Sequence, residues 1–327
     1  MATNPTSTTH PTLLDVVSRL DGDGKIAPIA EVLNEDLPIL RDIGFIQCNS
    51  DQRHVHTIRT GLPTPTWRKL YGGVLPSKSQ TAQVTDVCGN LEAYSEVDKD
   101  LADLNGNTSA WRFSEERPFI EAMGQTMAET IFYGDVTVNP ERFTGIAPRY
   151  NTLNTDTPCA RMVKSMGGTS DLTSLYFISH SVFHGLYPKG STGGLSKTDK
   201  GQVTITKDDG SMFEAYRTHF KWGIGTTLDD WRGCARVCNV DINNVDGDAL
   251  IAAMIKAKNE ILAKYVGRTK LYVRREIMTI LELAALSKSY QCLKITEAAD
   301  QFKTSFFGIP IVVCDSISIN EDQVTAD

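Results

Sequence analysis

Apolar side chains recur at three- and four-residue steps in one long stretch of the chain, which predicts an amphipathic helix from Ser114 to Tyr133. Ser114 is a suitable N-cap, and Pro118 falls in the first turn, where its missing N–H costs little. Gly134 follows the helix as a stop signal. The apolar stripe consists of Phe119, Ala122, Met123, Met127 and Ile131.

Residues 53–88 show a different pattern, with alternating Val, Thr and Ile at both ends and turn-forming residues between them. The interruptions are Pro63, Pro65, Gly72, Gly73 and Pro76. This arrangement predicts two strands joined by a long irregular excursion instead of a tight hairpin turn. Connections of this length are uncommon inside compact domains and are usually functional.

The rest of the chain predicts a mixed α and β protein. Short helices are expected near residues 13–20 and 29–38, and the near-continuous apolar run at 174–187 is typical of a buried strand. A hairpin is expected over 201–226, with Asp209 and Gly210 at its turn. The remaining predictions are a helix at 248–265, a strand at 270–275, a helix at 276–288 and a last strand at 308–317.

Composition and charge narrow the class of protein. With 327 residues, 41% hydrophobic and 22% charged, the chain is expected to fold into one large or two ordinary globular domains. No apolar run approaches the roughly 18 residues of a membrane span. The first twelve residues are polar and do not resemble a secretory signal. The net charge of −7 argues against a general nucleic-acid binder.

Motifs for catalysis or cofactor binding are not found. The seven cysteines are widely spaced without a CxxC pair, so we expect reduced, packed thiols. His180 and His184 have the spacing of helical metal ligands, but in a strand they would lie about 13 Å apart. The Gly-rich stretches at 167–170 and 191–194 lack a phosphate-binding pattern. We therefore predict no catalytic residue, no metal site and no organic cofactor.

Charge is unevenly distributed around the predicted excursion. Residues 51–80 carry a balance of +4, and residues 86–106 carry a balance of −5. These stretches are either unrelated solvated faces or complementary surfaces that meet between copies of the chain. The apolar residues of the excursion favour the second interpretation, because a protruding apolar loop needs a partner to cover it. The candidate contact residues are Arg59, Trp67, Arg68, Lys69, Tyr71, Lys78, Glu92, Glu96, Asp98, Asp100 and Asp103.

Several segments together resemble a known family. They are the polar N-terminal arm, the interrupted loop, the acidic stretch at 91–107, the long helix, and residues 140–151, 184–195, 222–241, 269–281 and 308–317. Over nearly the whole chain, this series resembles the major capsid protein of a tailed, podovirus-like bacteriophage. The shared motifs are structural, so they indicate a family and not a reaction.

The resemblance implies the Hong Kong 97-type capsid fold. This is a mixed α+β fold with a long spine helix, an extended β-hairpin loop, a peripheral domain and an axial domain. By position, residues 1–52 would be the N-terminal arm region and residues 53–90 the extended loop. Residues 91–149 would be the peripheral domain with the spine helix at 114–133. Residues 150–327 would be mainly the axial domain, with the last strand a candidate for returning to the peripheral domain.

The same resemblance implies a non-enzymatic virion subunit, made in the host bacterial cytoplasm, that self-assembles through pentamers and hexamers into an icosahedral capsid. The implied partners are scaffold, portal and decoration proteins and nonspecifically bound double-stranded DNA, with no membrane. Lys69 and Lys78 lie in the loop, but no context for a Lys–Asn crosslink is visible, so crosslinking is not predicted. Two alternatives remain open: an encapsulin-like compartment shell, and a soluble oligomeric α/β enzyme.

Overall fold

The computed structural model describes residues 37–104, 108–191, 193–207, 209–288, 293–298 and 301–326. The two short helices predicted near 13–20 and 29–38 lie outside these residues, apart from the last two positions. The described chain forms two compact units. Unit 1 comprises residues 90–127 and 194–223, and unit 2 comprises residues 37–89, 128–193 and 224–326.

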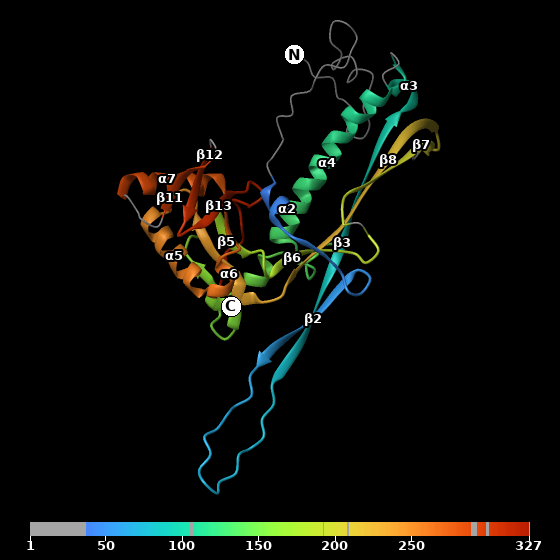
Figure 1. The fold of residues 1–327 in the computed structure, drawn as a ribbon. Helices are drawn as coiled ribbons and strands as arrows, with labels where there is room; N and C mark the ends of the chain where they lie inside the picture. The colour runs from blue at the N-terminus through green and yellow to red at the C-terminus, as the bar shows by residue number, and fades with distance from the viewer. Residues whose placement is uncertain are drawn as a thin grey trace. The chain divides into compact units, whose positions relative to one another are not determined.

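The helices and strands are labelled in Figure 1. The first half of the chain contains α2 (Pro38–Asp42), β1 (Phe45–Gln47), β2 (Arg53–Gly61), β3 (Gln80–Asp98), α3 (Lys99–Ala102), α4 (Thr108–Tyr133), η2 (Pro148–Tyr150), η3 (Pro158–Met162), β4 (Val163–Ser165), β5 (Leu172–Ser179) and β6 (Phe183–Tyr187). The second half contains β7 (Ser196–Thr206), β8 (Met212–Leu228), η4 (Trp231–Gly233), β9 (Ala235–Asp241), α5 (Gly247–Glu260), α6 (Ala263–Val266), β10 (Thr269–Val273), α7 (Arg275–Lys288), β11 (Leu293–Ala298), β12 (Gln301–Phe306) and β13 (Ile309–Val313). No helix among the described residues is long and apolar enough to cross a bilayer.

A seven-stranded sheet forms the core of unit 2, with strand order β11-β12-β13-β10-β5-β9-β4. The sheet is mixed, because β5 runs antiparallel to β9 and β10, whereas β13 runs parallel to β10. All eight residues of β5 are buried, as expected for a central strand covered on both faces. Helix α5 packs against β9 and β4 and beside α7 (Figure 1).

A buried polar network holds the C-terminal segment to this sheet. The guanidinium of Arg236 on β9 donates to Glu321 at 2.6 Å, and both side chains are less than 5% exposed. Glu321 also accepts hydrogen bonds from Ser174 and from the Tyr133 hydroxyl. Burial raises the pKa of the Tyr133 phenol well above its ordinary value, so this hydroxyl stays a donor. The segment is therefore fixed by a charge pair that water does not reach.

The second sheet has strand order β1-β6-β8-β3-β2, with β7 paired to β8. Strand β1 runs parallel to β6, and Phe45 faces Gly185 across the pair. A Cβ at position 185 would lie only 2.4 Å from the Phe45 ring. Glycine is thus required where this ring crosses the strand.

Helix α4 confirms the predicted long helix but begins six residues earlier, at Thr108. Ser114 is therefore not the N-cap, and Pro118 lies inside the helix instead of in its first turn. The additional turns are anchored by Trp111, which is buried against Val97 and Ala102 in unit 1. An apolar anchor upstream of the expected cap outweighs the local start signal, because packing supplies most helix stability in proteins.

The predicted apolar stripe of α4 is largely correct. Met123, Met127 and Ile131 are buried, whereas Ala122 is exposed and Phe119 is half-buried. The helix ends at Tyr133, directly before Gly134, as predicted. The Gly134 N–H still makes a helical hydrogen bond to the Thr130 carbonyl, at 2.8 Å. A Cβ on Gly134 would lie 2.3 Å from the Phe143 carbonyl oxygen. Glycine at the end of α4 therefore also allows a close contact between two backbone segments.

Two other predicted boundaries are wrong. The apolar run at 174–187 is not one strand but two, β5 and β6, separated by a turn at residues 180–182. The helix expected at 248–265 is broken into α5 and α6, because Ile261 and Leu262 adopt extended backbone conformations. Ile261 is 5% exposed, so the extended backbone at this break directs an apolar side chain into the core. The hairpin formed by β7 and β8 and the helix α7 match their predictions.

Candidate inter-subunit surface

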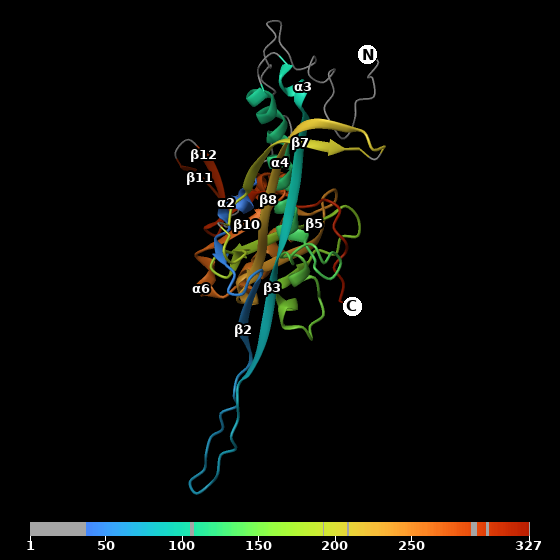
Figure 2. The same cartoon turned by 90° about the vertical axis from the view of Figure 1, so that its right-hand side faces the viewer.

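Within the predicted extended-loop region of residues 53–90, the strands β2 and β3 are joined by residues 62–79, which are called the extended loop from here on and project from unit 2 as a long arm (Figures 1 and 2). The strands that carry it are antiparallel and pair from Arg53 opposite Val87 to Gly61 opposite Gln80. Within the loop, the Gly72 N–H donates to the Lys69 carbonyl, and the Ser77 hydroxyl donates to the Thr64 carbonyl. The structure confirms the predicted pair of strands joined by an irregular excursion.

Hydrogen bonds from a neighbouring segment hold the base of the extended loop. The Asn49 side chain accepts from the Val55 N–H at 2.9 Å and donates to the Val55 carbonyl at 2.6 Å. The Cys88 N–H donates to the Gln52 carbonyl, and the Lys189 N–H donates to the Asp51 carbonyl. The arm thus leaves from a fixed base.

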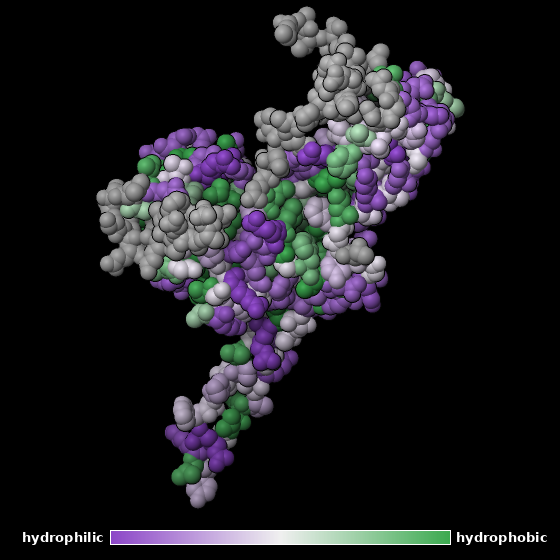
Figure 3. All heavy atoms as spheres, turned by 45° about the horizontal axis from the view of Figure 1, so that its top comes forward, coloured by the Kyte–Doolittle hydropathy of each residue, from purple (hydrophilic) through white to green (hydrophobic). Residues whose placement is uncertain are grey.

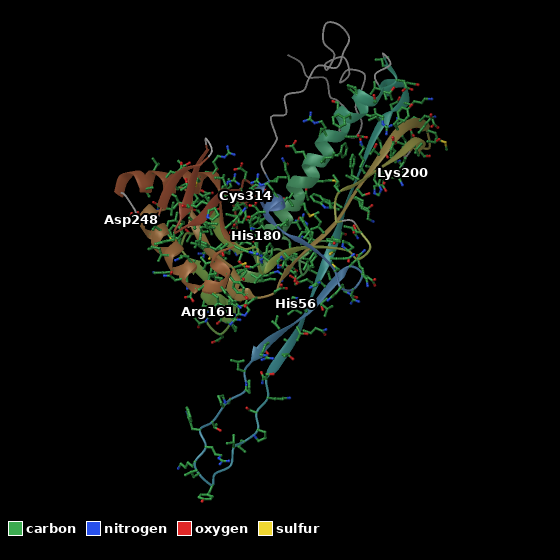
Figure 4. All side chains as sticks on the ribbon, in the orientation of Figure 1. His56, Arg161, His180, Lys200, Asp248 and Cys314 are labelled. Atoms are coloured by element: carbon green, nitrogen blue, oxygen red, sulfur yellow. The ribbon has the colours of Figure 1, made fainter. Side chains whose placement is uncertain are left out.

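Large apolar side chains of the extended loop stand in solvent. Trp67 and Tyr71 are as exposed as in a fully extended chain, at 103% and 105%. Figure 3 shows hydrophobic residues along the arm, and Figure 4 shows its side chains pointing away from the backbone. The other exposed apolar members are Leu62, Leu70, Val74 and Leu75. A cluster of this kind on a protruding arm is typical of a surface that a partner covers.

The extended loop is also purely basic. Arg68, Lys69 and Lys78 are exposed, and residues 62–79 contain no acidic residue. Arg59, on β2 below the loop, is exposed as well. The structure therefore brings the predicted basic and apolar candidates together on one arm, where they are available to a second molecule.

The predicted acidic candidates lie in unit 1, and two of them, Glu92 and Glu96, pair with basic side chains of their own chain. Glu92 on β3 accepts from Lys221 at 2.9 Å and from His219 at 3.0 Å. The Lys221 and His219 hydrogen bonds lower the pKa of the Glu92 carboxyl. Glu96 accepts from Arg217 at 2.6 Å. These carboxylates form a cross-strand ladder with β8, so much of their charge is balanced within the subunit.

The other acidic candidates differ in exposure and role. Asp98 caps α3 by accepting from the backbone N–H of Asp100 at 3.0 Å. Asp103 accepts from the Thr108 hydroxyl at 2.7 Å. Asp100 is exposed. Asp86, counted in the acidic stretch, is buried in unit 2 and pairs with Arg149 at 2.8 Å. The free negative surface is therefore smaller than the sequence balance suggests.

Sequence reasoning missed the cationic side of the ladder. Arg217, His219 and Lys221 alternate along β8 and so point to one face of the strand. Tyr94, between Glu92 and Glu96, stacks on the His219 ring with centroids 4.5 Å apart. The matching alternation of acids on β3 and bases on β8 is visible in the sequence, but only strand pairing brings the two together.

The histidines of unit 2 do not form a metal site. Among the described residues, no group of three or more His, Cys, Asp or Glu is placed to hold a metal ion. His180, labelled in Figure 4, contacts the Tyr272 hydroxyl at 2.9 Å, and that hydroxyl donates to Asp42 on α2. Burial lowers the pKa of His180 to about 4. This chain of bonds fastens α2 to β10.

Comparisons with known proteins agree with this architecture. The family model for the major capsid protein GP7 matches residues 21–325. A chain of the solved structure of bacteriophage epsilon15 is 32% identical, with 98% of each chain covered and a TM-score of 0.77. A chain of the bacteriophage JBD30 capsid is 10% identical, covers 89% of this chain and 93% of its own, and has a TM-score of 0.51, which shows the fold alone.

An encapsulin complex from Synechococcus elongatus also matches, at 12% identity over 72% of this chain and 98% of the other. Its TM-score of 0.44 carries no weight for the encapsulin alternative. No curated protein matches the chain.

The fold is that of phage capsid proteins of the Hong Kong 97-like type, as predicted. The chain belongs to the major capsid protein GP7 family. It is therefore a structural subunit that self-assembles into the icosahedral capsid of a bacteriophage, and it belongs in the virion. The family is not enzymatic, so the enzyme alternative is set aside.

Proposed function

We propose that the extended loop, residues 62–79, forms a principal assembly contact between neighbouring capsid subunits. The observation that carries the proposal is the full exposure of Trp67 and Tyr71 on either side of exposed Arg68. Trp, Tyr and Arg are the residue types most enriched in interface hot spots. Because these side chains add little to the stability of their own unit, substitutions here should change assembly without unfolding the subunit.

The partner surface that fits best is negative and belongs to a second copy of the chain. Asp100 is the most available acidic candidate, and Asp103 and Glu92 are partly engaged within the subunit. Contacts between exposed charges are weak, at about 0–1 kcal/mol each. A closed shell repeats each contact many times, so modest losses compound.

The double variant Trp67→Ala with Arg68→Glu tests the loop proposal. We expect a folded, soluble subunit with an unchanged melting curve by circular dichroism and no shells by sedimentation and electron microscopy. A matched control, Val138→Ala with Arg142→Glu, alters an exposed apolar residue and an exposed arginine outside the loop, and should assemble. If the loop variant forms normal shells, the loop is not an assembly contact. If the loop variant fails to fold, the loop is part of the subunit's core.

Further partners follow from the same role. We propose that the subunit forms pentamers and hexamers, is made in the host bacterial cytoplasm, and works with scaffold, portal and decoration proteins. Co-expression of the chain with candidate genes from one phage genome, followed by purification of complete particles, tests this. The division into domains by position stays a prediction: an arm region to residue 52, the wider extended-loop region at 53–90, a peripheral domain at 91–149 and mainly the axial domain at 150–327.

We also propose that double-stranded DNA is enclosed without sequence-specific contacts. The support is the net charge of −7, because phosphate binding scales with the lysines and arginines engaged. Filter binding of the purified subunit to two unrelated duplexes should give weak and equal retention that falls as salt rises. Tight retention of one duplex alone would contradict this.

A further inference from the structure

Two buried cysteines meet at the base of the extended loop in unit 2. The Sγ atoms of Cys48, just after β1, and Cys88, on β3, lie 3.3 Å apart. Both side chains are less than 9% exposed and share an apolar cluster with Leu186 and Ile46. The backbones are held in place, because the Cys48 N–H donates to Tyr187 and the Cys88 N–H donates to Gln52. The two thiols are thus presented to each other by fixed strands.

We propose that Cys48 and Cys88 are a modification site, at which a peroxide oxidises the two thiols to a disulfide once the particle is outside a reducing compartment. The Sγ atoms must approach by about 1.3 Å to reach the S–S bond length of about 2.05 Å. The intervening chain spans the whole of β2 and the extended loop. The bond therefore closes a covalent ring at the root of the arm.

The chemistry needs two steps and one peroxide. The thiolate of one cysteine attacks a peroxide oxygen, the O–O bond breaks, and that cysteine becomes a sulfenic acid as water leaves. The Sγ atom of the other cysteine then attacks the sulfenic sulfur, the S–O bond breaks, and a second water carries away the proton of the attacking thiol. Two thiols are oxidised by two electrons in total, and one peroxide is reduced to two waters.

The surroundings set the pace of these steps. Burial raises the pKa of both thiols. The hydrogen bond between the two Sγ atoms can run in either direction, so either thiol can be the first nucleophile while the other resolves the sulfenic acid. Because thiolates are the reactive form, the pair should oxidise slowly at neutral pH and faster in alkali.

A disulfide here would restrain the unfolded chain around a loop of 40 residues, which stabilises the folded state. It would also tie the segment that follows β1 to the strand that carries the extended loop. The disulfide would therefore restrain the base of the extended loop when a force acts on the loop.

The test uses purified assembled protein treated with hydrogen peroxide, quenched with catalase, denatured, alkylated with iodoacetamide and mapped by mass spectrometry. We expect a peptide in which Cys48 and Cys88 are crosslinked, reversible by dithiothreitol, and a melting temperature several degrees higher after oxidation. Cys48→Ala and Cys88→Ala should each lose the crosslink and the gain in melting temperature. Cys238→Ala, a buried cysteine of the other sheet, should keep both.

The peptide map of the parent protein is decisive even if a cysteine variant does not fold. Alkylation of both Cys48 and Cys88 after an exposure that oxidises half-buried Cys159 would overturn the proposal. So would conversion of either Cys48 or Cys88 to a sulfinic acid without a crosslink, because the other cysteine would then have failed to act as the resolving thiol.

Discussion

Glu321→Gln is predicted to destabilise unit 2 strongly, although it changes a single atom of the side chain. Glu321 is the carboxylate that balances Arg236, and both are buried, at 4% and 3% exposure. The glutamine keeps the shape but leaves a guanidinium without a counter-charge, away from water. Removing one partner of a buried pair costs about 3–5 kcal/mol.

This loss is measurable by thermal unfolding. A cost of 1 kcal/mol lowers the melting temperature of a 150–250-residue domain by about 2–4 °C, so we expect Glu321→Gln to melt roughly 10 °C below the parent. The control is Glu260→Gln, which breaks the pair with Lys164 at 3.1 Å near the surface. Exposed pairs contribute about 0–1 kcal/mol, so the control should melt within a few degrees of the parent.

A double variant separates the charge from the packing. Arg236→Met with Glu321→Gln removes the stranded cation, so its cost should be smaller than the sum of the two single costs. Equal melting temperatures for Glu321→Gln and Glu260→Gln would contradict this prediction, because the buried pair would then contribute no more than a surface pair. Strict additivity in the double variant would show that the two side chains do not interact.

Two further predictions concern a helix and a pH dependence. Met123→Asp places a charge at a position of α4 that is 4% exposed, so this variant should give insoluble subunits. The control variant Met123→Leu should be soluble. A soluble Met123→Asp variant with the parent's melting curve would contradict the prediction. The folded pKa of His180 is about 4, below the ordinary 6.5, so the unfolded chain binds the proton first and stability is lost as pH falls from 6.5 towards 4. Between pH 6.5 and pH 4, the melting temperature should fall less steeply with pH for His180→Gln than for the parent. An unchanged slope would exclude His180 as the cause of the pH dependence.

Much of the fold could be predicted from local patterns. The strong period of α4 fixed its C-terminal half, and prolines and glycines marked the extended loop as a long excursion. The start of α4 could not be predicted, because Trp111 owes its place to Val97 and Ala102, which lie outside the helix. The break between α5 and α6 also depends on burial of Ile261, and no helix-stop residue in the neighbouring sequence predicts it.

The candidate surface was predictable only in part. The basic and apolar residues of the extended loop are adjacent in sequence, so their common exposure follows from one loop. Glu92 and Glu96 have partners more than 120 positions away along the chain, in His219 and Arg217. A charge balance along the sequence counts Glu92, Glu96 and Asp86 as free, and strand pairing and burial show that they are not.

Electron microscopy of the purified protein, expressed alone, tests whether the chain assembles with itself as a capsid subunit. A capsid subunit that associates through repeated contacts of one arm should form closed shells, sheets or tubes, which negative stain distinguishes without further treatment. We expect such assemblies from the parent chain. Uniform small oligomers under all conditions of salt and concentration would contradict it.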